Sequence, residues 1–255
     1  MELSMYQRDI LEKFKSNSQR ARVLTENWMS KAMFCPNCLN SNLSTFPNNN
    51  PASDFFCQNC TERYQLKSQK TNFGRKINDG AYSTMVNSII KNTRPNFFLL
   101  YYNTEYSVKE LSLIPSFFFT ESIIEKRKPL NENARRKGWT GCNILIEKIP
   151  PEGRIWIIKE GHFIKKEDIS TKFRKMRFLK SADLSERGWI IDTLRIIRKV
   201  NEKEFTLKDI YAYEEELLKE HPNNHHIKAK LRQQLQILRD RKLLKFKGNG
   251  CYQMI

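Results

Sequence analysis

The chain has 255 residues, of which 39% are hydrophobic and 29% charged, enough for one large domain or two smaller ones with a real core. Its formal net charge of +17 favours a polyanionic partner, although a generally basic surface would give the same value. Every apolar stretch is shorter than the ~20 residues of a membrane span, and the first residues lack a signal-peptide pattern. We therefore expect a cytoplasmic protein with no membrane partner.

The first two thirds of the chain predict a mixed α/β domain. Apolar residues at helical spacing on both sides of Ser16-Asn17-Ser18 indicate two helices before about residue 30. A further helix, with an apolar face that includes Met85, Ile89 and Ile90, is expected after Asn78-Asp79-Gly80. Apolar runs and alternation predict strands at Ser53–Gln58, Arg63–Ser68, Asn96–Tyr102, Tyr106–Ile114 and Arg154–Glu160.

From about Ser181 the chain becomes rich in helical patterns. Leu184–Val200 predicts one helix, Thr206 to Asp209 resembles a helix N-cap, and Asn223–Arg241 predicts a longer helix. Leu243–Met254 predicts a β-hairpin around a Gly-Asn-Gly turn. Helices followed by a terminal hairpin outline a winged helix, so we expect two domains, residues 1–181 and 182–255, with most of the positive excess in the first.

Four of the six cysteines form two pairs, Cys35 with Cys38 and Cys57 with Cys60, each separated by two residues. Thiolates at this spacing fit one edge of a zinc tetrahedron, and two such pairs are typical of a zinc ribbon. The alternative is two redox or disulfide pairs, which a reducing compartment disfavours. Four thiolates leave no open position for a substrate, so the predicted zinc is structural and holds the strand that carries Asp54.

Asp54 and the run Gln65-Leu66-Lys67 form a second pattern, typical of a metal-dependent nuclease centre. Mg²⁺ takes oxygen ligands and lowers the pKa of an attacking water. Residues two apart on a strand face one side, so Gln65 and Lys67 would share a site with Asp54. The candidate magnesium ligands are Asp54, Gln65 and the backbone carbonyl of Leu66, and Lys67 can orient the water or stabilise the phosphate. Alone this pattern is weak, because a surface Asp and a solvated Lys would look the same.

Longer motifs strengthen it, namely Leu66-Lys67-Ser68, Ile77 to Tyr82, Arg135 to Trp139, Gly141 to Ile144 and Ile227 to Asp240. Together with the cysteine pairs they resemble the DpnI-type methyl-directed restriction endonucleases over nearly the whole chain. The resemblance implies a PD-(D/E)xK nuclease domain with structural zinc followed by a winged helix, in a bacterial protein that we expect to be a monomer. It implies Mg²⁺-dependent cutting of both strands of GATC when the adenine is 6-methylated. It also implies catalytic roles for Asp54 and Lys67, and zinc ligation by Cys35, Cys38, Cys57 and Cys60.

One position departs from the family pattern, because Gln65 stands where the family has Glu. A carboxamide oxygen can ligate a metal, but the exchange removes one negative charge, so Mg²⁺ should bind more weakly. Glu26 is a candidate for a compensating carboxylate. Three explanations stay open: a natural working variant, an engineered inactivation, or a degenerate reader that binds adenine-methylated DNA without cutting it. A zinc-ribbon transcription factor is a third class of function.

Two groups of residues are candidates for contact with double-stranded DNA. In the predicted last helix, one face is apolar and should pack on the core. The opposite side carries residue types that can read bases in the major groove, since Gln can hydrogen-bond adenine and Arg can hydrogen-bond guanine. That arc contains His225, Ala229, Arg232, Gln233 and Gln236, and the predicted buried face contains Ile227, Leu231, Leu235 and Leu238. In the first domain, Arg135 and Arg136 suit phosphate clamping. By analogy with the family, Trp139 beside them is the candidate methyl sensor; a core Trp next to a basic loop is the alternative.

Overall fold

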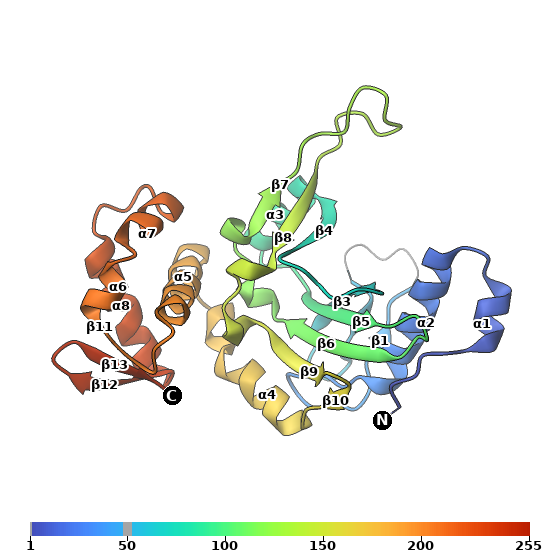
Figure 1. The fold of residues 1–255 in the computed structure, drawn as a ribbon, viewed down its shortest axis with the longest axis horizontal. Coiled ribbons are helices and arrows are strands. Elements are labelled where there is room, and N and C mark those ends of the chain that lie inside the picture. The colour runs from blue at the N-terminus through green and yellow to red at the C-terminus, as the bar shows by residue number, and fades with distance from the viewer. Residues whose placement is uncertain (1, 48–52) are drawn as a thin grey trace.

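The computed structural model describes residues 2–47 and 53–255. A mixed α/β body is built on a seven-stranded sheet, and a helical tail ends in a small three-stranded sheet (Figure 1). The expected fold class, an α/β domain of the restriction-endonuclease type followed by a winged helix, is confirmed. Among the described residues, no helix combines the length and apolarity that a membrane span requires.

The main sheet has the strand order β1-β2-β3-β5-β6-β9-β10. β3 (Arg63–Gln69) runs parallel to β5 (Asn96–Tyr102), and the other neighbouring pairs are antiparallel. β5 was predicted with these bounds, and its unbroken apolar run suits a strand that is covered on both faces. The remaining strands are β1 (Ser44–Thr45), β2 (Phe55–Phe56), β6 (Val108–Ile114), β9 (Ile155–Lys159) and β10 (His162–Phe163).

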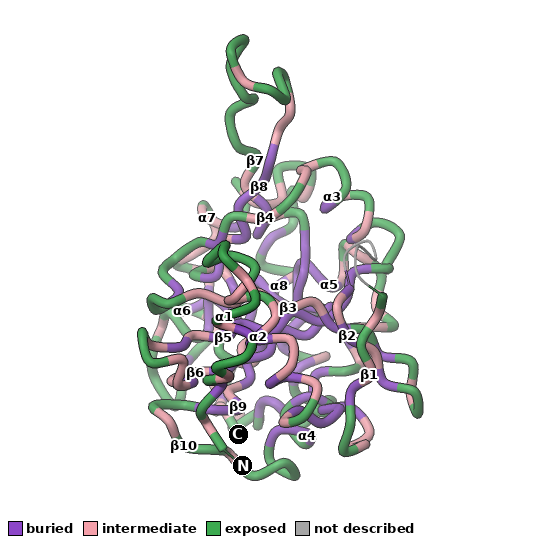
Figure 2. Tube along the Cα trace, turned by 90° about the vertical axis from the view of Figure 1, so that its right-hand side faces the viewer, coloured by how far each residue is buried: buried purple, intermediate pink, exposed green. Residues whose placement is uncertain are grey.

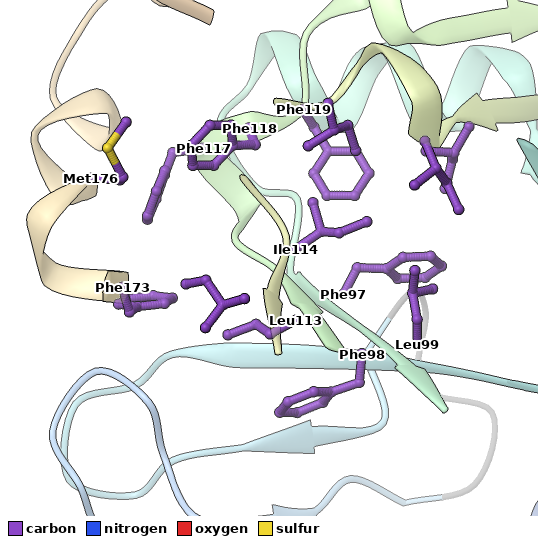
Figure 3. Close-up of a cluster of buried hydrophobic side chains, with 14 of the residues drawn as sticks. Phe97, Phe98, Leu99, Leu113, Ile114, Phe117, Phe118, Phe119, Phe173 and Met176 are labelled. Atoms are coloured by element: carbon purple, nitrogen blue, oxygen red, sulfur yellow. The ribbon is translucent and has the colours of Figure 1, made fainter. Parts of the chain in front are cut away.

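The core lies on both sides of β5. Phe97 and Phe98 follow each other along the strand and therefore point to opposite faces (Figure 3). On one face Phe97 meets Phe119 edge to face, with ring centroids 6.0 Å apart, and on the other Phe98 stacks on Tyr64 of β3 at 5.0 Å. These contacts hold β3 firmly beside β5, so the side chains at the free edge of β3 have a rigid support.

The predicted pair of N-terminal helices is confirmed, with a break before Asn17. α2 packs against β3, where Thr25 Oγ1 lies 3.4 Å from Ser68 Oγ. The helices of the α/β body are α1 (Arg8–Lys13), α2 (Asn17–Ala32), α3 (Tyr82–Ile90) and α4 (Lys166–Lys175), with short 3-10 turns η1 (Ser116–Phe118), η2 (Glu121–Ile123), η3 (Ile146–Lys148), η4 (Pro151–Gly153) and η5 (Arg177–Lys180).

A second sheet with the order β4-β8-β7 was not predicted from the sequence. It consists of β4 (Lys76–Ala81), β8 (Gly141–Leu145) and β7 (Ile124–Lys126). For Asn78-Asp79-Gly80 the sequence predicted only that a helix follows, and pairing of Asp79 with Cys142 makes the segment part of a strand. Residues 127–140, which join β7 to β8, form a long exposed arm that projects from the body (Figures 1 and 2). We call this segment the arm.

The tail follows the predicted winged-helix order. α5 (Leu184–Val200) has the predicted bounds, and α6 (Leu207–Tyr211) begins at a capping box between Thr206 and Asp209. The hairpin of β12 (Leu244–Gly248) and β13 (Cys251–Met254) is also as expected, and β11 (Glu204–Thr206) adds a third strand in the order β11-β13-β12. The structure adds α7 (Glu214–Glu220), a short helix that the sequence analysis did not predict.

Two expectations on helices were wrong in detail. α8 (Ile227–Asp240) begins later than the predicted Asn223, because the Asn224 side chain accepts a hydrogen bond from the His226 amide at 2.8 Å and favours a turn. Ile90, which we expected on the apolar face of α3, is 53% exposed. Adjacent residues on a helix point in different directions, so Ile89 fills the core position and Ile90 does not.

Ion pairs connect the tail to the α/β body. Lys148 Nζ lies 2.9 Å from Glu220 Oε1, and Arg198 Nε donates to Glu152 Oε1 at 2.9 Å. The pairs hold α5 and α7 against the 3-10 turns η3 and η4. The domain boundary between residues 181 and 182 remains a prediction.

Candidate functional site

The four paired cysteines come together in space. One sulfur from each forms a group whose members all lie within 4.8 Å of one another, made of Cys35, Cys38, Cys57 and Cys60. Cys35 Sγ is 3.4 Å from Cys60 Sγ, and Cys38 Sγ is 3.5 Å from Cys57 Sγ. All four are free thiols, so the disulfide alternative is not what the structure contains.

This group fits a zinc ion. Zn–S bonds of about 2.3 Å in a tetrahedron place sulfurs roughly 3.8 Å apart, close to the separations seen here. Burial opposes ionisation of Cys38, but hydrogen bonds led by the Asn40 backbone lower the pKa of its thiol to about 7. A thiolate, which zinc requires, is therefore accessible at Cys38 near neutral pH, whereas burial raises the pKa of the Cys35 and Cys60 thiols, so zinc would have to displace their protons. The four close cysteines can hold a zinc ion.

The cysteine group also fixes the start of β3. The Tyr64 hydroxyl lies 3.0 Å from Cys35 Sγ, and the Cys57 amide donates to the Glu62 carbonyl at 2.9 Å. Tyr64 pairs with Phe55 across the short β2–β3 ladder. Because the ladder is only two residues long, β3 has an open edge beyond Tyr64.

Asp54 occupies that open edge. Its amide donates to the Tyr64 carbonyl at 2.9 Å, just beyond the two paired residues of the β2–β3 ladder. Beyond Tyr64, the Asp54 side chain takes the place of a strand backbone as the hydrogen-bond acceptor for β3. Asp54 Oδ2 accepts a hydrogen bond of 2.6 Å from the Leu66 amide. The structure thus brings Asp54 against the Gln65-Leu66-Lys67 run, as the sequence analysis expected, through an amide contact that the sequence did not predict.

Gln65 and Lys67 project from the same side of β3, since they are two residues apart on a continuous strand. The Gln65 Oε1 atom is buried and has no hydrogen-bond partner among the described residues. Leaving a buried carbonyl oxygen unpaired costs about 1–3 kcal/mol, so an absent partner such as a cation explains it well. Leu66 packs against the core, as predicted.

Two further charged residues lie at this edge. Burial raises the pKa of Asp54, and the Leu66 amide and the Arg22 guanidinium oppose that shift. Burial also raises the pKa of Glu26; Arg22 lowers it, and the charge of Asp54 raises it again. Arg22 Nε and Glu26 Oε1 are 3.8 Å apart on α2. The sequence analysis did not single out Arg22, although its spacing of four residues from Glu26 is a detectable signal.

Lys67 reaches toward the second sheet. Burial raises the pKa of the Cys142 thiol to about 11, as does the charge of Asp79, while Arg94, Lys67 and Arg127 act to lower it. Cys142 is on β8 and Arg127 is the first residue of the arm. Arg127 at the base of the arm and Lys67 on β3 therefore both lie close enough to the Cys142 thiol to affect its pKa.

The arm carries the predicted basic and aromatic residues together. The Arg136 guanidinium stacks over the Trp139 ring at 4.7 Å, and Arg135 is exposed. Trp139 is half-buried rather than a core residue, and its ring covers Gly141, where an added Cβ would lie 2.9 Å from it. The Trp139 ring is therefore held at the base of the arm between Arg136 and Gly141 and is half-buried.

The last helix presents the predicted faces. The expected apolar residues Ile227, Leu231, Leu235 and Leu238 are all buried. The expected reading residues His225, Ala229, Arg232, Gln233 and Gln236 are all exposed. Arg232 Nη1 donates to the Tyr211 hydroxyl at 2.9 Å, a contact that the sequence analysis did not identify. The arm and this helix lie in different domains, so the DNA-contact candidates form two separate groups (Figure 1).

Comparison with known families agrees with this arrangement. Residues 1–182 match DpnI, the Dam-replacing family, and residues 185–254 match the Dam-replacing HTH domain. The chain belongs to the Dam-replacing family. The resemblance drawn from the motifs is thereby confirmed. Membership of the Dam-replacing family implies a restriction-type nuclease whose action is directed by methylation, and the HTH match supports DNA binding by the tail.

Proposed function

We propose that this protein is a type II methyl-directed endonuclease that cuts both strands of GATC containing 6-methyladenine, by Mg²⁺-dependent hydrolysis. The observation that carries the proposal is the hydrogen bond between Asp54 Oδ2 and the Leu66 amide. It holds a carboxylate against the strand that carries Gln65 and Lys67, on a rigid sheet edge next to the basic arm.

The edge has the donor set that magnesium takes. Asp54, the unpaired Gln65 Oε1 and the Leu66 backbone carbonyl are oxygen ligands, which suit a hard cation. When bound there, Mg²⁺ would neutralise the scissile phosphate and lower the pKa of a water. Cys35, Cys38, Cys57 and Cys60 would hold a structural zinc, and their close sulfurs support this assignment.

The chain's own residues do the remaining work. The Leu66 amide holds the Asp54 carboxylate at the edge, and its hydrogen bond offsets part of the rise in the Asp54 pKa that burial causes. The Lys67 ammonium donates to the phosphate oxygens and orients the water. The water oxygen bonds to phosphorus and its proton passes to solvent, while the bond from phosphorus to the leaving sugar oxygen breaks and that oxygen takes up a proton from solvent.

Recognition is divided between the two domains. In the arm, Arg135 and Arg136 contact phosphates and Trp139 senses the methyl group. In the tail, Arg232, Gln233 and Gln236 read base edges in the major groove, with His225 beside them. The net charge of +17 supports affinity for DNA, and binding should weaken steeply as salt rises.

Gln65 favours a second candidate, a reader of adenine-methylated DNA that does not cut. Without the family carboxylate the metal site carries less negative charge, and cleavage can be lost while DNA binding stays.

Incubation with Mg²⁺ and plasmid that is either methylated at GATC or unmethylated separates the two functions. Cleavage of methylated plasmid alone supports the endonuclease. Specific binding of methylated GATC oligonucleotides with no cutting over a range of Mg²⁺ concentrations supports the reader. Equal cutting of both plasmids would contradict both.

A further inference from the structure

The neutral Gln65 leaves the proposed cation site with one carboxylate on the main sheet, so a second one must come from elsewhere if the site is to bind a divalent ion well. Magnesium sites in proteins commonly use one or two carboxylates together with waters and substrate oxygens. α2 can supply it, because it packs directly on β3.

Two contacts bring α2 and Asp54 to the same stretch of β3. Thr25 Oγ1 of α2 lies 3.4 Å from Ser68 Oγ, and Asp54 Oδ2 lies 2.6 Å from the Leu66 amide. Leu66 and Ser68 are two residues apart, roughly 7 Å along a strand. Glu26 immediately follows Thr25, so its backbone also lies beside β3, and its side chain leaves α2 about 100° around the helix from that of Thr25.

The Glu26 carboxylate is also available. Its side chain is 30% exposed, and its nearest ionic partner is Arg22 at 3.8 Å. Within residues 2–47 and 53–255 no hydrogen bond to this carboxylate is present. The charge of Asp54 acts on Glu26, which agrees with the two carboxyls facing one region. The unpaired Oε1 of Gln65 belongs to the same stretch of β3 and independently points to a missing ligand.

We propose that Glu26 supplies the second carboxylate of the divalent-cation site, from α2, in place of the charge that Gln65 lacks. This inference rests on the proposed magnesium site. Arg22 then acts as the counter-ion of Glu26 when the cation is absent. The cation site would then carry two carboxylates, that of Glu26 on α2 and that of Asp54 at the edge of β3.

Binding of Mn²⁺ to the full-length, zinc-loaded chain, measured by electron paramagnetic resonance of the free ion, tests this without cleavage. We expect Glu26→Gln to weaken Mn²⁺ binding about tenfold or more, the scale of a lost ligand or its supporting group. Glu12→Gln is the matched control, because Glu12 also pairs with an arginine four residues earlier, Arg8, on an exposed helix. It should change the affinity less than twofold.

The double variant Glu26→Gln/Gln65→Glu should recover most of the lost affinity, since it moves the carboxylate from α2 to β3. Zinc content and the unfolding midpoint of each variant report whether the fold is intact. Unchanged Mn²⁺ affinity in folded Glu26→Gln, together with a loss in Asp54→Asn, overturns the role of Glu26 and leaves the proposed function standing. Unchanged affinity in both variants overturns the cation site itself. A loss in Glu26→Gln with no cutting by the wild type keeps the inference and refutes the cleavage.

Discussion

The cysteine group and the Asp54 edge both adjoin the short β2–β3 ladder, yet they satisfy their polar atoms differently. In the cysteine group the sulfurs contact one another at 3.4 and 3.5 Å, and the Tyr64 hydroxyl adds a contact at 3.0 Å. At the edge, Asp54 has one amide donor and the buried Gln65 Oε1 has none among the described residues. The first arrangement suits stability. The second keeps polar groups ready for a ligand at a cost to stability, which is common at functional sites.

The largest expected effect is the loss of stability that follows a change in the cysteine group. Cys57→Ala removes a fully buried zinc-ligand candidate, and loss of a structural metal typically costs on the order of 4–5 kcal/mol or more. We expect loss of bound zinc and unfolding at a much lower denaturant concentration, measured by circular dichroism and metal analysis. Cys251→Ala, at a half-buried cysteine outside the group, is the control and should keep both properties. Equal effects of the two changes would show that the group has no special structural role.

The second-largest effect is expected on the rate of DNA cleavage, with stability unchanged. Lys67→Met keeps the length and apolar stem of the side chain but removes the ammonium group. We expect cleavage of methylated plasmid to fall by about 10²–10³, the scale of losing one preorganised donor, with an unchanged unfolding midpoint. Lys91→Met, at an exposed lysine after α3, should cut normally. If Lys67→Met cuts as fast as the wild type, Lys67 has no part in the reaction.

Gln65→Glu should have the opposite effect on the Asp54 edge, with faster cleavage and lower stability in the absence of metal. The change adds a carboxylate at the unpaired oxygen, so cleavage at limiting Mg²⁺ should rise about tenfold, the effect of an improved ligand set. The same carboxylate should lower stability in the absence of metal, because it is buried beside Asp54. Gln19→Glu adds an equal charge at an exposed position of α2 and serves as the control. Identical Mg²⁺ dependence in Gln65→Glu and the wild type would mean that Gln65 is not a ligand.

The smallest effect provides a reference for an ordinary local contact. Thr206→Ala removes the capping box of α6 and should cost about 1 kcal/mol of stability. The Thr206 amide, and after it the Thr206 hydroxyl, hold the pKa of Asp209 below its usual range, and Thr206→Ala removes the contribution of the hydroxyl. A depressed folded-state pKa stabilises above the unfolded pKa, and the stabilisation is lost as pH falls through the folded value. The difference between Thr206→Ala and the wild type should therefore shrink in acid, as urea unfolding at several pH values can measure.

Much of the local structure could be predicted because it depends on short-range patterns. α5 and β5 have the predicted bounds, and all four apolar positions of α8 are buried, since a period of 3.6 residues defines one face. The cysteine pairs were also recognisable by spacing alone. β4, β7 and β8 were missed because short strands with polar residues exist only when they pair with one another.

By itself, the sequence determined which residues could act: two thiol pairs at zinc spacing, an acid before a Gln-x-Lys run, and a helix with a reading face. The tertiary structure decided which of them meet. Asp54 reaches Leu66 only because the β2–β3 ladder ends after two residues and leaves a free amide. The charge of Asp54 acts on Glu26 because α2 packs on β3 at Thr25. Both outcomes depend on contacts between distant segments, and such contacts follow from packing rather than from local pattern.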